Sequence, residues 1–303
     1  MTRIRRPRRC QLAVPGSNPR MMEKAAASGA DHVFLDLEDA VAPSAKVDAR
    51  NKVIHALNSH NFGKTVRCVR INDLRTSWCF RDIIAVVEGA GGNLDTILVP
   101  KVMSAADVQF VSTLLDQIEG DLGLVRRIGI EVLIEEVEAL QNVEMIARAS
   151  PRLEALVFGM GDYSASHGVD IRAIGASADA YPGDIWHYAR FRLVMAARAA
   201  GIDPIDGPYA NFRNHEGYAE ECRRAATIGM VGKWAIHPDQ VRIATAAFSP
   251  KGEDIGMARR MADEYAKAEA AGLGSVSIDG MMVDAASIRI LRGIIDKADL
   301  YQL

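Results

Sequence analysis

Short apolar segments rich in β-branched residues alternate with longer stretches of helical periodicity along most of the chain. We predict eight strands from these segments, and the seventh is the weakest because it is short and begins with Pro204. The strands are expected at residues 10–14, 32–37, 65–71, 96–99, 127–134, 155–158, 204–205 and 232–236. A strand–helix unit repeated eight times predicts an α/β fold, a closed parallel TIM (β/α)8 barrel rather than an open sheet.

Capping residues support the helices between these strands. Ser44 is expected to cap a helix over residues 45–57, and Ser104 one over residues 105–119. Gly201 is expected to end a helix over residues 187–200, and Asn18 with Pro19 to begin one after the first strand. We therefore assign residues 1–240 to a barrel domain. Residues 241–303, with a helix near 262–271, form a C-terminal helical extension expected to act as a lid.

Composition excludes several classes of protein. The 303 residues carry a formal net charge of −3, so the whole chain is not a polyanion binder and no nucleic-acid partner is expected. No apolar run approaches the length of a membrane span, so no membrane partner is expected. The four cysteines show no CxxC spacing, which indicates a reducing compartment. We expect a cytoplasmic enzyme.

The N-terminus differs locally, because five of its first nine residues are arginine. Pro15 and Gly16 soon interrupt the apolar residues that follow, which excludes a signal peptide. Two interpretations stay open for this arm: a disordered, solvated segment, or a contact with substrate phosphates.

Polar residues follow the predicted strands at the point where each strand ends. They are Gly16-Ser17-Asn18, Glu38-Asp39, Arg70 with Asn72, Lys101, Glu135, Asp162, Asp206 and His237. In a TIM barrel these ends meet at one mouth, where active sites lie. Any single one of these residues could be a solvated loop charge. Polar residues at the ends of all eight strands favour an active site.

Two of these residues at strand ends are suitable ligands for a metal ion. Glu135 and Asp162 follow the fifth and sixth strands, so their carboxylates are expected side by side on the rim. Mg²⁺ binds one or two carboxylates and keeps open positions for water and substrate oxygens. Zinc is less favoured, since no His/Cys cluster of ligand spacing is present. The alternative for Glu135 is an ordinary member of the acidic run Glu135-Glu136-Val137-Glu138.

Arg70 ends the third strand between apolar neighbours, where a cation is costly unless it meets an anion. It is either a structural ion pair with a mouth carboxylate or a fixed cation for a developing enolate. A helix is predicted to begin at Ser17 and Asn18, and Arg20 and Lys24 follow in its first turns. This helix start is either an anion-binding site or a plain helix cap. His237 either shapes a ligand wall or is structural.

The motifs also match a known family, in order and over nearly the whole chain. The chain resembles the citrate lyase β-subunit and malyl-CoA lyase family, of the HpcH/HpaI aldolase type, most nearly the malyl-CoA and β-methylmalyl-CoA lyases. The matching segments are Val14-Pro15-Gly16-Ser17-Asn18-Pro19-Arg20, Asp36-Leu37-Glu38-Asp39-Ala40-Val41-Ala42-Pro43, Val69-Arg70-Ile71-Asn72, Pro100-Lys101, Ile134-Glu135, Phe158-Gly159-Met160-Gly161-Asp162-Tyr163, Ile205-Asp206-Gly207-Pro208 and Lys233-Trp234-Ala235-Ile236-His237-Pro238.

The resemblance implies a barrel with a C-terminal lid, assembled as a homotrimer or homohexamer. It implies Mg²⁺, with Mn²⁺ as a possible substitute, on Glu135 and Asp162, and Arg70 facing the thioester enolate. Asp284, in Asp279-Gly280-Met281-Met282-Val283-Asp284, matches the acid/base that a lid carries into a neighbouring subunit's site. We assign coenzyme A binding and support of the site to the remaining candidates. Those for coenzyme A are Ser17, Asn18, Arg20, Lys24, Ile236 and His237, and the supporting residues are Glu38, Asp39, Lys101 and Asp206.

The implied reaction is reversible cleavage of a short 3-hydroxyacyl-CoA, such as malyl-CoA or β-methylmalyl-CoA, into acetyl-CoA or propionyl-CoA plus glyoxylate. The partners are thus an acyl-CoA and a 2-oxoacid. Alternatives are a malyl-CoA thioesterase, a citramalyl-CoA lyase, a metal aldolase for CoA-free oxoacids and a non-catalytic acyl-CoA-binding barrel. Two departures bear on the substrate: Met281 stands where the family commonly has Lys, and the segment 164–183 is shorter than in the nearest relatives.

Overall fold

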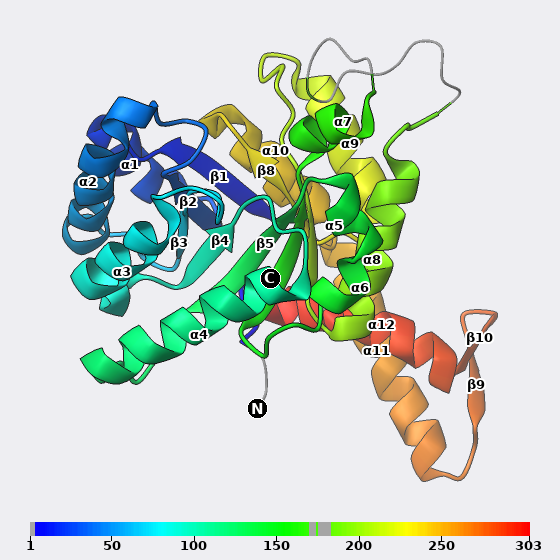
Figure 1. Ribbon diagram of the computed structural model, residues 1–303. Coiled ribbons are helices and arrows are strands. Elements are labelled where there is room, and N and C mark those ends of the chain that lie inside the picture. Colours follow the sequence, from blue (N-terminus) through cyan, green and yellow to red (C-terminus); the bar gives the residue numbers. More distant parts are fainter. Residues whose placement is uncertain (1–3, 170–173, 175–182) are drawn as a thin grey trace. The chain divides into compact units, whose positions relative to one another are not determined.

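A computed structural model describes residues 4–169, 174 and 183–303. Eight parallel strands close into a barrel, each strand pairing with the next and β1 with β8, as Figure 1 shows. The strands are β1 (Cys10–Pro15), β2 (His32–Asp36), β3 (Val66–Arg70), β4 (Thr96–Val99), β5 (Gly129–Ile134), β6 (Leu153–Phe158), β7 (Asp203–Asp206) and β8 (Gly232–Ala235). The predicted TIM barrel is confirmed, including the short seventh strand with its proline.

Helices follow the strands and cover the barrel from outside (Figure 1). They are α1 (Pro19–Ala26), η1 (Pro43–Ala45), α2 (Lys46–Ser59), α3 (Cys79–Ala90), η2 (Gly91–Asn93), α4 (Ala105–Leu122), α5 (Val137–Gln141), α6 (Val143–Ile146), α7 (Met160–His167), α8 (His187–Ala200), α9 (His215–Thr227) and α10 (Pro238–Phe248). The segment 164–183, expected to bear on the substrate, lies largely outside the described residues.

The strands are buried on both faces, which explains their nearly continuous apolar sequences. Every residue of β2, β4, β5 and β6 is buried. One face packs against the helices in the larger core, and the other fills the barrel interior. The interior cluster contains Phe34, Cys68, Leu98, Leu133, Ala155, Val157, Ile205, Val231 and Trp234. The barrel interior is therefore a packed core and not a pore.

Most predicted helix ends are confirmed. The Asn18 side chain accepts a hydrogen bond from the Met21 amide, Ser104 forms a capping box with Asp107, and Gly201 ends α8 in the left-handed region at φ 70°. The prediction for Ser44 is wrong. Ser44 lies inside η1, which begins at Pro43, and its side chain makes no capping bond. Proline fixes its own φ and starts the helical turn one residue earlier.

The arginine-rich arm is not a solvated segment where it meets the barrel. Arg8 is 1% exposed and its guanidinium contacts Glu131, Glu154 and Asp203. Arg9 makes a bidentate pair with Asp31, with Nη2 at 2.7 Å from Oδ1. A buried arginine is stable only with anionic partners, and strands β5, β6 and β7 supply them here. Arg8 thus belongs to the barrel core.

The chain divides into two compact units, one of residues 1–4 and 8–248 and one of residues 5–7 and 249–303. The second contains α11 (Gly252–Ala270), a hairpin of β9 (Ser275–Ile278) with β10 (Met281–Asp284), and α12 (Ala285–Tyr301). Its small core is formed by Met261, Tyr265, Val283 and Ile288. Helix α11 begins ten residues earlier than the helix predicted near 262–271. The predicted boundary after residue 240 stays a prediction.

Among the described helices, none has the length and apolar character that a membrane crossing requires.

Candidate active site

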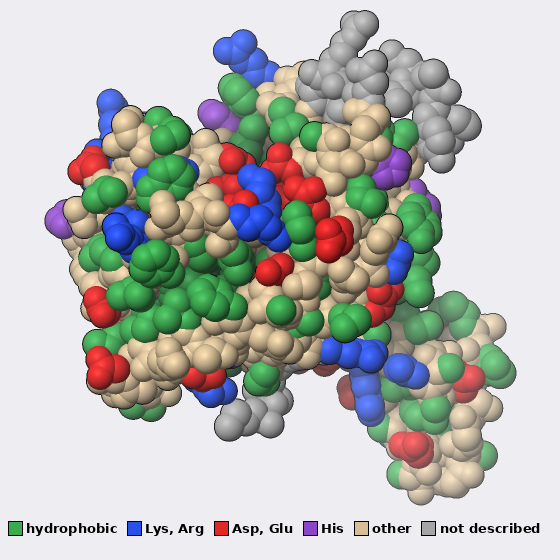
Figure 2. Space-filling model, in the orientation of Figure 1, with side chains coloured by type: hydrophobic (Ala, Val, Ile, Leu, Met, Phe, Trp, Pro, Cys, Tyr) green, Lys and Arg blue, Asp and Glu red, His purple; other side chains and the backbone are tan. Residues whose placement is uncertain are grey.

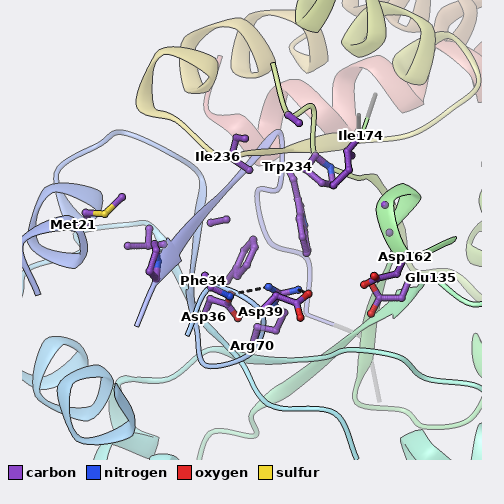
Figure 3. Close-up of a pocket in the computed structure, with 18 residues that line it drawn as sticks. Met21, Phe34, Asp36, Asp39, Arg70, Glu135, Asp162, Ile174, Trp234 and Ile236 are labelled. Carbon is purple, nitrogen blue, oxygen red and sulfur yellow. Dashed lines mark hydrogen bonds and ion pairs between the residues drawn. The ribbon is translucent and has the colours of Figure 1, made fainter. Parts of the chain in front are cut away.

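A cavity of about 630 Å³ opens at the carboxyl ends of the strands. Its walls come from the ends of β1, β2, β3, β5, β6 and β8 and from the loops after them, as a TIM barrel predicts. Figure 3 shows the charged side chains of Asp36, Arg70, Glu135 and Asp162 at one end of this cavity, with Ile236 and Ile174 at the other. Charged side chains also gather in Figure 2, where acidic groups surround basic ones near the upper middle of the face.

Glu135 and Asp162 come together as the sequence predicts (Figure 3). Glu135 directly follows β5, and Asp162 lies in the first turn of α7, which directly follows β6. Strands β5 and β6 are neighbours, and Ile134 pairs with Phe158 in the last register position. Gly159 lets the two segments approach, since a Cβ on it would lie 2.5 Å from the Cβ of Glu135. The local sequence thus brings the two carboxylates to one wall.

Glu135 is a buried carboxylate with two other carboxylates nearby. Burial raises the pKa of Glu135 to about 8, with the Asp162 and Glu38 carboxylates adding to the shift while Arg70 opposes it. The Lys101 amide donates to Glu135 Oε1 at 2.8 Å. A buried carboxylate beside two others suits a cation. Among the described residues no three His, Cys, Asp or Glu side chains cluster as a metal cage. Two oxygen ligands and open positions fit Mg²⁺ and not structural zinc.

Arg70 ends β3 and is held by Asp36, the last residue of β2. Asp36 Oδ1 accepts from Nε and Oδ2 from Nη2, both at 2.7 Å. The two residues are register partners in adjacent strands, so the pair follows from strand order. Glu38 Oε2 lies 2.9 Å from Arg70 Nη1. The pKa of Asp36 is lowered, because the Arg70 guanidinium and two backbone amides outweigh burial. The ion-pair interpretation of Arg70 is therefore correct, and Arg70 also lines the cavity.

Lys101 joins the two carboxylate groups of the mouth. Its ammonium lies 2.6 Å from Glu38 Oε1, 3.7 Å from Asp39 and 3.8 Å from Asp162. Its backbone has φ 50°, which is uncommon for a residue other than glycine. This conformation directs the amide to Glu135 while the side chain reaches Glu38. Lys101 thus lies between Glu38, Asp39 and Asp162, and a supporting role of these residues in the reaction stays a prediction.

The coenzyme A candidates lie in α1, in the loop before it and directly after β8. Ile236 lines the cavity, and so does Met21 from α1. Arg20 and Lys24 are exposed on the same helix, and Asn18 caps it.

His237 and Ser17 lie beside these residues in the chain. His237 stacks on Phe212 with ring centroids 4.7 Å apart, and its Nδ1 lies 3.3 Å from Asp239. The Ser17 carbonyl accepts from Lys52 at 3.4 Å. A role of either residue in binding the cofactor stays a prediction.

Asp206 and Asp284 are not among the residues that line this cavity. Asp206 is fully buried at the end of β7, where Lys233 contacts it at 2.6 Å and Arg190 at 2.9 Å. These two cations lower its pKa although burial opposes them. Asp206 does not line the cavity and ties β7 to β8 and α8. Asp284 belongs to the second unit, where its carboxylate caps α12 by accepting from the Ser287 amide at 2.8 Å. The hydrogen bonds from Ser287 lower the pKa of Asp284.

Two residues of the site were missed by sequence reasoning. Asp36 was passed over beside Glu38 and Asp39, although pairing the last residues of consecutive strands would have found it. Trp234 also lines the cavity, with its ring centroid 5.6 Å from the guanidinium carbon of Arg70 and 4.5 Å from the Phe34 ring. Its position inside β8 carried no signal that distinguished it from a core aromatic residue.

Comparison with known proteins agrees with this geometry. Residues 9–238 match the family described as HpcH/HpaI aldolase/citrate lyase. The L-malyl-CoA/beta-methylmalyl-CoA lyase of Cereibacter sphaeroides is 43% identical over 97% of this chain and 96% of the relative. A (3S)-malyl-CoA thioesterase of Cereibacter sphaeroides is 35% identical over 97% of this chain and 95% of the relative.

A solved structure agrees as well. The crystal structure of the protein CitE from Mycobacterium tuberculosis in complex with magnesium, acetoacetate and coenzyme A has a TM-score of 0.74 and 28% identity, covering 97% of this chain and 98% of that one. The resemblance inferred from the motifs is therefore confirmed, and the chain belongs to the HpcH/HpaI aldolase/citrate lyase family.

Proposed function

We propose that this protein is a Mg²⁺-dependent carbon–carbon lyase. It would reversibly cleave malyl-CoA or β-methylmalyl-CoA into glyoxylate and acetyl-CoA or propionyl-CoA. The observation that carries the proposal is one cavity with two chemically different walls, the Glu135–Asp162 carboxylate pair and the Arg70 guanidinium fixed by Asp36. The lyase relative named above, alike over nearly its whole length, supports the choice of substrate.

Glu135 and Asp162 would hold the ion, with Lys101 orienting Glu135 through its amide. When bound, Mg²⁺ supplies a Lewis acid that polarises the carbonyl of the oxoacid. Asp162 is 42% exposed in its side chain, so a ligand can reach it from the cavity. Mn²⁺ has the same preference for oxygen ligands and would be a substitute.

Arg70 would stabilise the negative charge that develops on the thioester oxygen. Its Nε and Nη2 donate to Asp36, which holds one edge of the guanidinium before substrate arrives, and Glu38 Oε2 lies 2.9 Å from Nη1. Arg70 itself lines the cavity. A charge fixed in advance stabilises a transition state without reorganisation at the moment of reaction.

Asp284 would move the proton at the α-carbon, taking it in the condensation direction and returning it in cleavage. The Asp284 carboxylate is ionised at neutral pH, as a base requires, and the hydrogen bonds from Ser287 that lower its pKa make it a weaker base until they are released. We further propose that Asp284 acts in the site of a neighbouring subunit, in a homotrimer or homohexamer. The start of α1 and Ile236 would bind the coenzyme A portion. The four cysteines are buried and free, which supports a reducing, cytoplasmic location.

Product analysis separates the proposal from its nearest alternative. The thioesterase relative makes hydrolysis of malyl-CoA a second candidate. The purified protein is incubated with Mg²⁺ and malyl-CoA, and the products are resolved by mass. Glyoxylate with acetyl-CoA is expected. Malate with free CoA would instead assign the thioesterase function, and an unchanged thioester in the presence of Mg²⁺ would contradict both. Citramalyl-CoA, tested in parallel, separates the lyases from each other.

A further inference from the structure

A chain of buried hydrogen bonds runs from the floor of the cavity into the centre of the barrel. Trp234 Nε1 donates to Gln11 Oε1 at 2.8 Å, and Gln11 Nε2 donates to Glu131 Oε2 at 2.7 Å. Gln11 and Glu131 are 0% exposed, and Trp234 is 5% exposed. Gln11 is the register partner of both Trp234 in β8 and His32 in β2. The side chains of Gln11, His32 and Trp234 therefore all face the barrel interior, where Gln11 and His32 meet Glu131.

The chemistry of the two ends fixes the orientation of the Gln11 amide. An indole N–H can only donate, so it requires the amide oxygen. At the other end Glu131 also receives Arg8 Nε at 3.2 Å and lies 2.9 Å from His32 Nε2. Although burial opposes ionisation, His32 and Arg8 keep the pKa of Glu131 well below its usual range. Its carboxylate only accepts, so it requires the amide nitrogen. Reversing the amide would break both hydrogen bonds.

The fixed Gln11 amide affects the position of Arg70 through the indole ring of Trp234. Asp36 holds one edge of the guanidinium, and a group held along one edge can still tilt about that edge. The Trp234 and Phe34 rings, with centroids 5.6 Å and 5.9 Å from the guanidinium carbon, face it from the barrel interior and restrict that tilt. Figure 3 shows the side chains of Phe34, Trp234 and Arg70 close together among the residues that line the cavity. The Trp234 ring restricts this tilt only if its own rotation is fixed. The hydrogen bond from Nε1 to Gln11 fixes that rotation.

We propose that Gln11 is a positioning residue, which fixes the indole of Trp234 and thereby the guanidinium of Arg70. Gln11 itself does not line the cavity. The assignment rests on the proposed function only in that Arg70 is taken to face the substrate. A structural readout that needs no substrate is therefore the primary test.

The full-length protein is labelled with 5-fluorotryptophan, whose three signals come from Trp78, Trp186 and Trp234. The variant Trp234→Phe identifies the third signal. In Gln11→Met the Trp234 signal is expected to shift and broaden, because the ring samples more than one rotamer, while the Trp78 and Trp186 signals stay in place. Arg70→Gln should also move the Trp234 signal in the wild-type background, and by much less in the Gln11→Met background. Unchanged Trp234 signals in Gln11→Met would overturn the proposal without any assay of turnover.

Tyr218→Phe is the matched control. It removes a buried hydrogen bond of 2.9 Å to the same residue, but to the carbonyl oxygen of Trp234 and not to the indole. Gln11→Met is expected to lower kcat about 10-fold with little change in KM for the thioester, as for a misplaced charge-stabilising group. Tyr218→Phe should leave kcat unchanged. Equal losses of kcat in the two variants would assign Gln11 a merely structural role and overturn the proposal.

A double-mutant cycle tests the route through the ring. Phenylalanine has no N–H to lose, so Gln11→Met combined with Trp234→Phe should lower kcat no further than Trp234→Phe alone. Fully additive losses would contradict a route through Trp234. Should Gln11→Met fail to fold, Gln11→Asn replaces it. That variant keeps the amide but is one methylene too short to reach both partners, so the same changes in signal and kcat are expected. If wild-type protein lacks lyase activity, the proposed function fails while the fluorine signals still decide the role of Gln11.

Discussion

Replacing Asp36 by asparagine removes one charge from the floor of the cavity with almost no change of shape. The Asp36 carboxylate accepts two hydrogen bonds from Arg70 at 2.7 Å. It also accepts from the backbone amides of Glu38 and Ala40 at 2.8 and 3.0 Å. In Asp36→Asn one oxygen becomes an NH₂ group, which faces a donor whichever way the amide turns. The variant therefore leaves two N–H donors unpaired, one from Arg70 and one from the backbone, and the Arg70 charge is only partly compensated.

The expected loss can be bounded from the neighbours that remain. Removing one partner of a buried ion pair costs about 3–5 kcal/mol when the other charge is left uncompensated. Here Glu38 Oε2 stays 2.9 Å from Arg70 Nη1 and provides part of the compensation. We therefore expect the free energy of unfolding of the barrel to fall by about 3 kcal/mol, the lower end of that range.

Asp39→Asn provides the control, since it makes the same chemical change at the same mouth. The Asp39 carboxylate is 58% exposed and lies 3.8 Å from Arg70 Nη1. Exposed pairs contribute about 0–1 kcal/mol, so this variant should unfold almost as the wild type does. Urea unfolding of both variants, followed by far-UV circular dichroism, gives the two free energies at constant slope. If Asp36→Asn loses no more than Asp39→Asn, Arg70 is not held by Asp36 and the account of the site is wrong.

Further predictions concern the metal site, acid stability and assembly. Asp162→Ala should abolish Mg²⁺ binding in calorimetry. The far-UV spectrum should stay unchanged, because this half-exposed side chain contributes little to the core. If the variant binds Mg²⁺ with wild-type affinity, Asp162 is not a ligand. Gly159→Ala should weaken Mg²⁺ binding at least about 10-fold by displacing Glu135, whose Cβ lies 2.5 Å from the added methyl group; retained affinity would show that the backbone relaxes. The pKa of Glu131 is lowered in the folded protein, so ionised Glu131 stabilises the fold. This contribution is complete above the ordinary carboxyl pKa of about 4.5 and declines as the pH falls toward the lower folded-state pKa. Glu131→Gln should therefore flatten the acid side of a plot of Tm against pH, and an unchanged slope there would contradict the assignment. Asp284→Asn should lower kcat by about 10²–10⁴-fold, and mixing it with inactive Asp162→Ala under conditions of subunit exchange should restore activity; an exchanged mixture that stays inactive would place Asp284 in its own subunit's site or outside the reaction.

The sequence determined the barrel and the approximate content of its mouth. The alternation of apolar segments with capped helices predicted eight strands, including β7 with its proline, and all eight are present in the barrel. Parallel strands place their carboxyl ends at one edge, so the polar residues at those ends could be assigned to one mouth from strand order alone. Glu135, Asp162 and Lys101 meet there for this reason.

The tertiary structure alone decided how these residues are paired and how deeply they are buried. The end of a strand fixes the edge that a residue occupies, but inter-strand register and the direction of each side chain determine its partner. Register and side-chain direction place Arg70 against Asp36 and turn Asp206 toward Lys233 and away from the cavity. They also bury Arg8 of the arginine-rich arm beside Glu131. They also joined Gln11 to Trp234 across 223 residues of sequence. Contacts of this kind depend on closure of the barrel, which brings the first and last strands together, and no local pattern of residues records them.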